Sequence, residues 1–168
     1  MNKTFTLCQR LVMVLLIGLV PMLSHAAPVN ETNVQNTQTD ATAKVERFLQ
    51  QSGLTYRKTG DRTWVVERQG KSMGKQTILV ATGPGFMVAG IILAAKNSMN
   101  ASSEMMFKLM KFNHSLDYVK VGFDDDDDLF IRMEVKTRLL DQQGFNEVFD
   151  LVANNAETVN AAMKPYIR

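Results

Sequence analysis

The chain has 168 residues, of which 45% are hydrophobic and 21% are charged, and these proportions are typical of one globular domain and argue against disorder over most of the length. Its 19 basic and 17 acidic residues give a formal charge of +2, and this excess disappears if the segment that holds Lys3 and Arg10 is removed. A chain without net positive charge lacks the electrostatic basis for binding nucleic acid, and we expect no nucleic-acid partner.

The first 26 residues have the pattern of a secretory signal peptide. Lys3 and Arg10 supply positive charge, residues 11–20 form an apolar run, and residues 24–26 (SHA) resemble a small-residue cleavage site. The apolar run is shorter than the ~20 residues of a membrane-spanning helix. We therefore expect cleavage after Ala26, no membrane span in the mature chain, and a location in the periplasm or outside the cell.

The chain contains one cysteine, Cys8. It precedes the apolar run instead of following it, which is not the position of a lipid-attachment cysteine. Because Cys8 lies in the segment expected to be removed, the mature chain would have no cysteine. We therefore expect no disulfide, no thiol chemistry and no thiolate metal site.

A flexible leader and a short helix are expected next. Residues 27–40 are rich in Asn, Thr and Gln and carry almost nothing to bury, which predicts a leader without structure. Residues 41–51 predict a helix with Asp40 as its N-cap and Gly53 as its C-terminal stop. The apolar residues of this helix recur at helical spacing: Val45, Phe48 and Leu49.

Turn residues divide the following stretch into strands, which we place at residues 63–69, 76–82 and 86–95. The last of these, FMVAGIILAA, shows no alternation of apolar and polar residues. A strand that is apolar on both faces is either central in its sheet or covered on its second face by a helix or a partner chain.

Residues 100–114 predict a second helix, capped by Ser102 or Ser103. Its polar residues form one narrow stripe, and apolar residues occupy more than half of its circumference, which is more than an ordinary amphipathic surface helix requires. We therefore expect this helix to be central, between the sheet and another surface. Its apolar residues are Met105, Met106, Phe107, Leu109, Met110 and Phe112.

Residues 117–135 predict an antiparallel hairpin, because two alternating β-prone runs, DYVKVGF and LFIRMEV, flank five consecutive aspartates at 124–128. The aspartate turn must stay in water. In the second run, one face is expected to be core and the other largely solvated. The core-facing residues are Leu129, Ile131, Met133 and Val135.

A regular amphipathic helix is expected over residues 142–164, with Asp141 as its cap and Pro165 at its end. The elements together predict a single α+β domain over residues 41–168. Its antiparallel sheet has about five strands in the order α-βββ-α-ββ-α, with the helices packed on the sheet.

The segment at residues 112–135, FNHSLDYVKVGFDDDDDLFIRMEV, followed by TRLLDQQGFNEVF, resembles the YbjN family. The resemblance covers residues 41–168, and it implies a type III secretion chaperone-like fold and a role in binding. The family's tentative label of sensory regulator implies a regulatory module as an alternative. The Gly that commonly interrupts the family's aspartate turn is replaced by Asp here. Type III secretion chaperones are cytoplasmic, whereas this chain carries an export signal, so a secretion duty does not follow from the fold.

Three motifs invite chemical interpretations that their spacing disfavours. The aspartates could bind calcium weakly, but Leu129 and Val135 stand where an EF-hand requires Gly and Glu. His114, Ser115 and Asp117 are the residue types of a hydrolase triad, yet they lie too close in sequence to converge easily on one substrate. GKSMGK at residues 70–75 differs from a phosphate loop in glycine spacing and lacks the following Ser or Thr, which favours a hairpin loop.

Our leading hypothesis is a non-enzymatic, exported binding protein without a cofactor, chaperone- or adaptor-like. It would hold an apolar segment of a protein partner or associate with itself as a homodimer. Methionines adapt to varied shapes and are frequent at promiscuous binding surfaces. A sensory module, an unrecognised hydrolase and a weak calcium-binding protein remain alternatives. The candidate partner-binding residues are Met105, Met106, Met110, Phe107, Ile91 and Ile92.

Overall fold

The computed structural model describes residues 31–168, with side chains from residue 40 onward. The expected signal peptide, its cleavage site and the first residues of the expected leader lie outside the described residues. Within residues 31–168, none of the helices has the length and apolar content needed to span a membrane.

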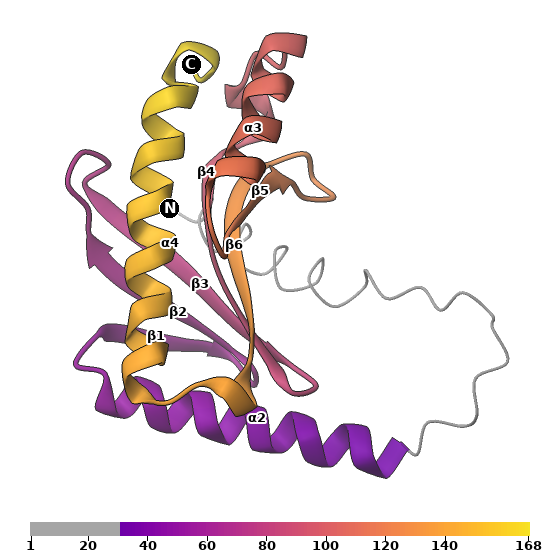
Figure 1. The fold of residues 1–168 in the computed structure, drawn as a ribbon. Helices are drawn as coiled ribbons and strands as arrows, with labels where there is room; N and C mark the ends of the chain where they lie inside the picture. Colours follow the sequence, from indigo (N-terminus) through magenta and orange to yellow (C-terminus); the bar gives the residue numbers. More distant parts are fainter. Residues whose placement is uncertain (1–30) are drawn as a thin grey trace, which may run out of the picture.

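The described chain runs in the order helix, four strands, helix, two strands, helix (Figure 1), and short 3-10 turns follow β4, β6 and α4. The α-helices are α2 (Glu31–Gln51), α3 (Ser103–Ser115) and α4 (Gln142–Met163). The strands are β1 (Thr55–Gly60), β2 (Thr63–Gln69), β3 (Lys75–Gly83), β4 (Phe86–Ala94), β5 (Lys120–Phe123) and β6 (Leu129–Lys136). The 3-10 turns are η1 (Lys96–Ser98), η2 (Thr137–Leu139) and η3 (Lys164–Tyr166).

All strand pairs are antiparallel, and the sheet order is β1-β2-β3-β4-β6-β5. Helix α4 lies along one face of this sheet, and α2 crosses the end of the strands near the β3–β4 turn (Figure 1). A hydrogen bond of 2.8 Å between the Thr42 and Thr82 hydroxyl groups joins α2 to the end of β3. The predicted α+β class with an antiparallel sheet is confirmed.

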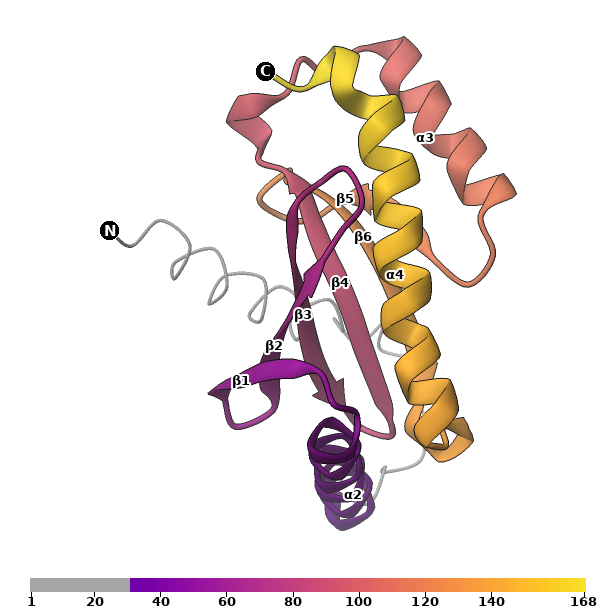
Figure 2. The same cartoon turned by 90° about the vertical axis from the view of Figure 1, so that its left-hand side faces the viewer.

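The hydrophobic core lies between the sheet and α4, with α2 closing one end. Figure 2 shows this layering from the side. The rings of Phe48 in α2 and Phe145 in α4 stand 5.3 Å apart, and those of Phe145 and Phe149 stand 5.0 Å apart in an edge-on arrangement. Such aromatic pairs add to the burial energy of the core.

Strand β4 occupies the centre of the sheet, between β3 and β6, which accounts for its uninterrupted apolar sequence. Met87, Ala89 and Ile91 face α4 and the core. On the other face, Gly90 pairs with Arg132 of β6. A Cβ atom at Gly90 would stand 2.9 Å from the Ile131 carbonyl oxygen, so only glycine fits without a backbone shift.

Two differences from the predicted elements have physical causes. The sheet has a sixth strand, β1, with the sequence TYRKTG, whose side chains are mostly exposed. A short polar edge strand carries no burial pattern, so alternation cannot reveal it. Helix α2 begins at Glu31, not at residue 41, and Asp40 therefore lies inside the helix and is not its cap. Gly53 adopts φ +71° just beyond the helix, as expected of a C-terminal stop.

The remaining elements follow the sequence pattern. The Ser102 side chain accepts the Met105 N–H at 3.2 Å and caps α3, and the Asp141 side chain accepts the Gly144 N–H at 2.7 Å and caps α4. Strands β5 and β6 form the predicted hairpin around the aspartates. The face of β6 that was predicted to be core contributes fully buried Leu129 and Ile131.

Candidate functional site

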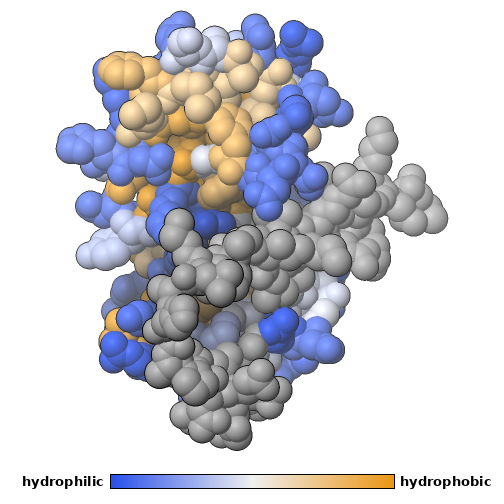
Figure 3. Space-filling view, turned by 90° about the vertical axis from the view of Figure 1, so that its right-hand side faces the viewer, coloured by the Kyte–Doolittle hydropathy of each residue, from blue (hydrophilic) through white to orange (hydrophobic). Residues whose placement is uncertain are grey.

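Helix α3 presents three large apolar side chains to solvent. Met106, Phe107 and Met110 have exposed fractions of 45%, 60% and 68%. Their spacing places them side by side on the helix surface, because residues three and four apart are neighbours there. We call these three residues the apolar α3 face. Figure 3 shows apolar side chains gathered at the end of the molecule where α3 lies.

The opposite side of α3 holds the helix against the domain. Met105 is fully buried and Leu109 is buried, and both belong to the hydrophobic core. Helix α3 packs beside the edge strand β5, so the prediction that this helix is central is wrong. The Asn113 side chain donates to the Val121 carbonyl at 2.7 Å and accepts the Val121 N–H at 2.8 Å. The apolar α3 face is therefore carried by a helix that is fixed along its other side.

The C-terminal residues brace the chain just before α3. The Asn100 N–H donates to the Tyr166 carbonyl at 2.8 Å, and the Arg168 N–H donates to the Ser98 carbonyl at 2.7 Å. Met99 and Ile167 form an isolated antiparallel bridge between these two segments. Figure 2 shows the C-terminus beside the chain that leads into α3. The entry to α3 thus has a fixed backbone position.

Basic and acidic side chains border the apolar α3 face. The Lys111 ammonium stands 4.8 Å from the centre of the Phe107 ring, and the Lys108 ammonium stands 5.4 Å from the Tyr166 ring. A hydrogen bond to Glu104 raises the pKa of Tyr166, since the neutral phenol is the donor. Apolar residues bordered by polar ones are typical of protein-binding patches.

The structure separates the six candidate partner-binding residues. Met106, Phe107 and Met110 come together on the apolar α3 face. Met105 and Ile91 lie in the core and are buried. Ile92 is half-buried and points to the face of the sheet away from α4, because it alternates with core-facing Ile91.

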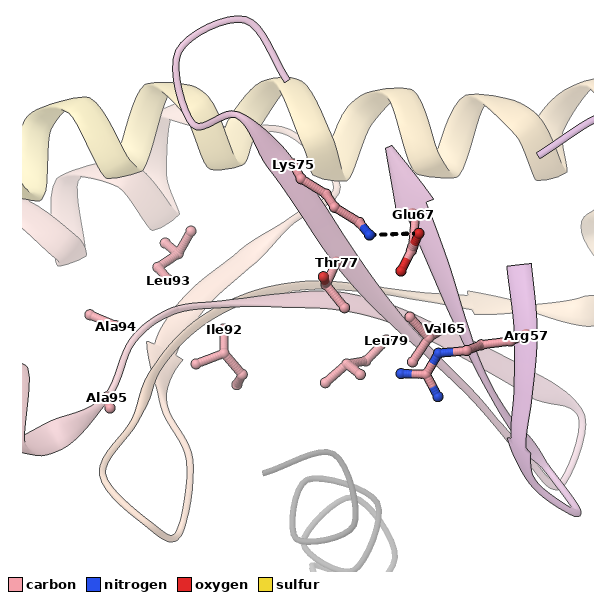
Figure 4. Close-up of a pocket in the computed structure, with 10 residues that line it drawn as sticks. All are labelled: Arg57, Val65, Glu67, Lys75, Thr77, Leu79, Ile92, Leu93, Ala94 and Ala95. Carbon is pink, nitrogen blue, oxygen red and sulfur yellow. Dashed lines mark ion pairs between the residues drawn. The ribbon is translucent and has the colours of Figure 1, made fainter. Parts of the chain in front are cut away.

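Ile92 lines a hollow of about 540 Å³ on that second face of the sheet (Figure 4). Its walls mix apolar and charged side chains, and the Lys75 ammonium pairs with the Glu67 carboxylate at 2.8 Å. The residues around it come from β1 to β4 and the chain after β4. They are Arg57, Val65, Glu67, Lys75, Thr77, Leu79, Ile92, Leu93, Ala94 and Ala95.

Sequence reasoning missed Tyr118, which links α3 to β5. Its side chain is 75% exposed, and its backbone adopts φ +65°, which is uncommon for a residue with a Cβ atom. Strained backbone of this kind often marks functional segments. The sequence gives little indication that Tyr118 is exposed, because an aromatic residue next to a strand is ordinarily predicted to be buried.

Carboxylates of the aspartate turn accept backbone hydrogen bonds that stabilise the turn. The Asp124 side chain accepts the N–H groups of Asp126 at 3.1 Å and Asp128 at 2.9 Å. Buried Asp128 accepts the Lys96 N–H at 2.8 Å, and the Lys96 ammonium pairs with Asp127 at 2.6 Å. Desolvation raises the pKa of Asp124. Within the part of the chain described, no three His, Cys, Asp or Glu side chains stand close enough to hold a metal ion.

Asp127 in this turn adopts φ +61°. A left-handed residue is most often Gly, and Asp tolerates the conformation because its short side chain can bond locally. His114, another candidate, stands in the last turn of α3. The GKSMGK segment connects β2 to β3 as the predicted hairpin loop.

Comparison with solved structures finds the same architecture in proteins of low sequence identity. A chain of the heterodimeric ExoU–SpcU complex from the type III secretion system of Pseudomonas aeruginosa aligns with a TM-score of 0.54 at 19% identity, over 71% of this chain and 97% of that one. A chain of the complex between the Yersinia pestis type III secretion chaperone SycH and a stable fragment of YscM2 aligns with a TM-score of 0.50 at 13% identity, over 71% and 98%.

These two alignments show that the fold resembles that of a type III secretion chaperone. A chain of the ExsC–ExsE complex also aligns, with a TM-score of 0.48 at 11% identity, over 75% of this chain and 95% of that one. No family model and no curated protein matches the chain. The chaperone-like fold that the YbjN resemblance implied is therefore supported by the structure neighbours, which are found in complexes with protein partners.

Proposed function

We propose that this chain is an exported, non-enzymatic binding protein that uses the apolar α3 face to hold an apolar segment of a protein partner or the same face of a second copy. The observation that carries the proposal is the exposure of Met106, Phe107 and Met110 on a helix whose other side is locked into the core. A fixed helix presents these side chains without the cost of ordering the backbone on binding, which favours affinity.

The fold supports this function, because the solved structures that share it are complexes with protein partners. The neighbouring structures are a heterodimeric complex from a type III secretion system and a type III secretion chaperone in complex with a protein fragment, and the present chain shares their architecture at low identity. Fold alone does not determine function. The apolar α3 face is the feature of this chain's own surface that supports binding.

Paired serine substitutions test the apolar α3 face. The double variant F107S with M110S removes most of its apolar area while leaving buried Met105 in place. We expect the processed protein from periplasmic extract to form a dimer or a complex with a partner by size-exclusion chromatography with light scattering. The double variant is expected to run as a monomer. The matched control L139S changes an apolar side chain that is 66% exposed on η2, and it should behave like the wild type.

A wild-type protein that stays monomeric and partner-free at all concentrations would overturn this function. So would a double variant that keeps the wild-type assembly. Chemical crosslinking followed by mass spectrometry distinguishes the two kinds of partner, because a self-pair joins α3 only to α3.

Export is part of the same proposal and has its own test. The signal-like pattern of the first 26 residues supports it. Intact-mass measurement of the protein recovered from the periplasm should give a chain that begins at Ala27. Recovery of the unprocessed chain in the cytoplasm would reject the location while leaving the binding function open.

A further inference from the structure

The β2–β3 loop closes around a carboxylate from the far end of the sequence. We call residues 70–74 the 70–74 loop. The Glu157 carboxylate of α4 accepts N–H groups from Lys71 at 2.8 Å, Ser72 at 3.0 Å and Met73 at 3.2 Å. It also accepts the Ser72 hydroxyl and, at 3.0 Å, the Gln76 side-chain amide. Figure 2 shows this loop reaching α4.

The backbone of the loop is shaped for an anion. Three successive N–H groups that converge on one point form a concave nest, which is a recurring anion-binding arrangement. The Gly70 N–H donates to the Gly74 carbonyl at 2.7 Å, and Gly74 adopts φ +70°. A Cβ atom at Gly70 would stand 2.2 Å from a Glu157 carboxylate oxygen. A larger residue at position 70 would therefore fit only if the Glu157 side chain moved from its present position.

The side chain below the loop supports the same role. Gln76 is only 2% exposed, and its amide nitrogen is directed at Glu157. All the donors around the carboxylate are neutral. Hydrogen bonds from the Ser72 hydroxyl and from the loop N–H groups lower the pKa of Glu157, while desolvation opposes them. The charged form of the carboxylate is the one that this site holds.

We propose that the 70–74 loop, with Gln76, is an oxyanion-binding site for a carboxylate or phosphate group, and that Glu157 is its resident ligand within the chain. The donors recognise an anion with two or more oxygens and do not recognise the rest of the glutamate side chain. When Glu157 is removed, the site accepts a small oxyanion from solution. This site is separate from the apolar α3 face, so it stands or fails independently of the proposed function.

Chemical rescue of E157A tests the site. The full chain carrying E157A keeps every donor and lacks the internal ligand. Its thermal unfolding midpoint is measured in sodium formate and in sodium phosphate, each against sodium chloride at equal ionic strength. We expect one or both oxyanions to raise the E157A midpoint by roughly 5 °C when they are well above their dissociation constant, because a ligand that binds only the folded state stabilises it.

The matched control is E147A, which removes an exposed glutamate from the same helix. Wild type and E147A should show no such selective gain, because Glu157 still fills their site. Rescue by formate alone assigns the site to carboxylates, and rescue by phosphate assigns it to phosphate groups as well. A gain in the E157A midpoint no larger than the gain of wild type and E147A in the same salts would overturn the proposal, because phosphate also stabilises folded proteins non-specifically.

Amide spectra locate the binding. In ¹H–¹⁵N correlation spectra of E157A, the signals of Lys71, Ser72 and Met73 should move on titration with the rescuing anion. Movement only elsewhere in the chain would also overturn the proposal. If E157A does not fold in chloride, its refolding in sodium formate and in sodium phosphate becomes the test, because an oxyanion that fills the site left by Glu157 should restore the folded state and chloride should not.

Discussion

The Asn113 side chain in α3 makes two hydrogen bonds with the backbone of Val121 in β5, donating to its carbonyl at 2.7 Å and accepting its N–H at 2.8 Å. Strand β5 is at the edge of the sheet, so its outer backbone groups have no neighbouring strand. The Asn113 amide takes the place of a strand residue there. Covering an edge in this way protects it from pairing with another chain.

We predict that N113A lowers the free energy of unfolding by about 1–3 kcal/mol, because it leaves two backbone groups of Val121 without partners. Urea unfolding followed by the fluorescence of Trp64, the single tryptophan, measures this change. The control N154A alters an exposed asparagine on α4 and should be nearly neutral. Equal unfolding midpoints for the two variants would show that Asn113 does not support the edge.

Two adjacent methionines should differ sharply in their effect on stability. M105A removes a fully buried side chain and is expected to cost about 2–5 kcal/mol through lost burial and a cavity. M106A changes a side chain that is 45% exposed and is expected to change stability by about 0.5 kcal/mol or less. The same urea titration compares them. Similar losses for both would mean that the buried side of α3 is assigned incorrectly.

Two glycines in the sheet, Gly90 in β4 and Gly122 in β5, should differ in how well they tolerate alanine. G90A should lower stability by about 1–3 kcal/mol, because its Cβ atom would press on the β6 backbone. G122A in β5 should be tolerated, since its Cβ atom would meet only the Phe130 ring at 3.6 Å. Thermal unfolding of the two variants is the measurement. A stable G90A protein would contradict the packing of β4 against β6.

The carboxylate of Glu157 should make stability depend on pH in a defined direction. Its pKa is lowered from an ordinary value of 4.5, chiefly by the Ser72 hydroxyl. A carboxyl group with a lowered folded-state pKa stabilises the protein fully above its unfolded pKa and loses that contribution as the pH falls through the folded value. The difference in unfolding midpoint between wild type and E157Q should therefore be constant near neutral pH and shrink below about pH 4.5.

Comparison with E157Q removes the contributions that other carboxylates make equally in both proteins. In proteins that carry S72A, the difference in unfolding midpoint between Glu157 and E157Q should be smaller, because S72A removes the largest cause of the lowered pKa of Glu157. A difference between wild type and E157Q that grows on acidification would reverse the sign and reject the hydrogen-bonded carboxylate as its source.

Local sequence patterns were sufficient for much of this fold. The alternation in the β5–β6 hairpin, the apolar run of β4 and the repeat of α4 each predict an element that the structure contains. Strand β1 was not predicted, because an exposed edge strand with polar side chains has no burial pattern. The first part of α2 was not predicted for a related reason, since its polar sequence carries no apolar stripe.

The candidate site was harder to predict because it depends on contacts between distant residues. The sequence predicts that α3 is apolar over more than half of its circumference, but it does not determine which side turns inward. The packing of Met105 and Leu109 into the core sets that orientation, and Met106, Phe107 and Met110 are exposed as a result. The contact between Glu157 and the 70–74 loop joins segments more than 80 residues apart, and no local pattern predicts it.

The bridge between Met99 and Ile167 has a consequence for the order in which the protein acquires its structure. The backbone of Ser98 and Asn100, which leads into α3, bonds to the backbone of Arg168 and Tyr166. Residues 166–168 are synthesised long after residues 98–100, so these contacts at the entry to α3 form late in folding. A chain truncated before Tyr166 would therefore lack these contacts at the entry to α3, while Asn113 would still join the other end of the helix to β5.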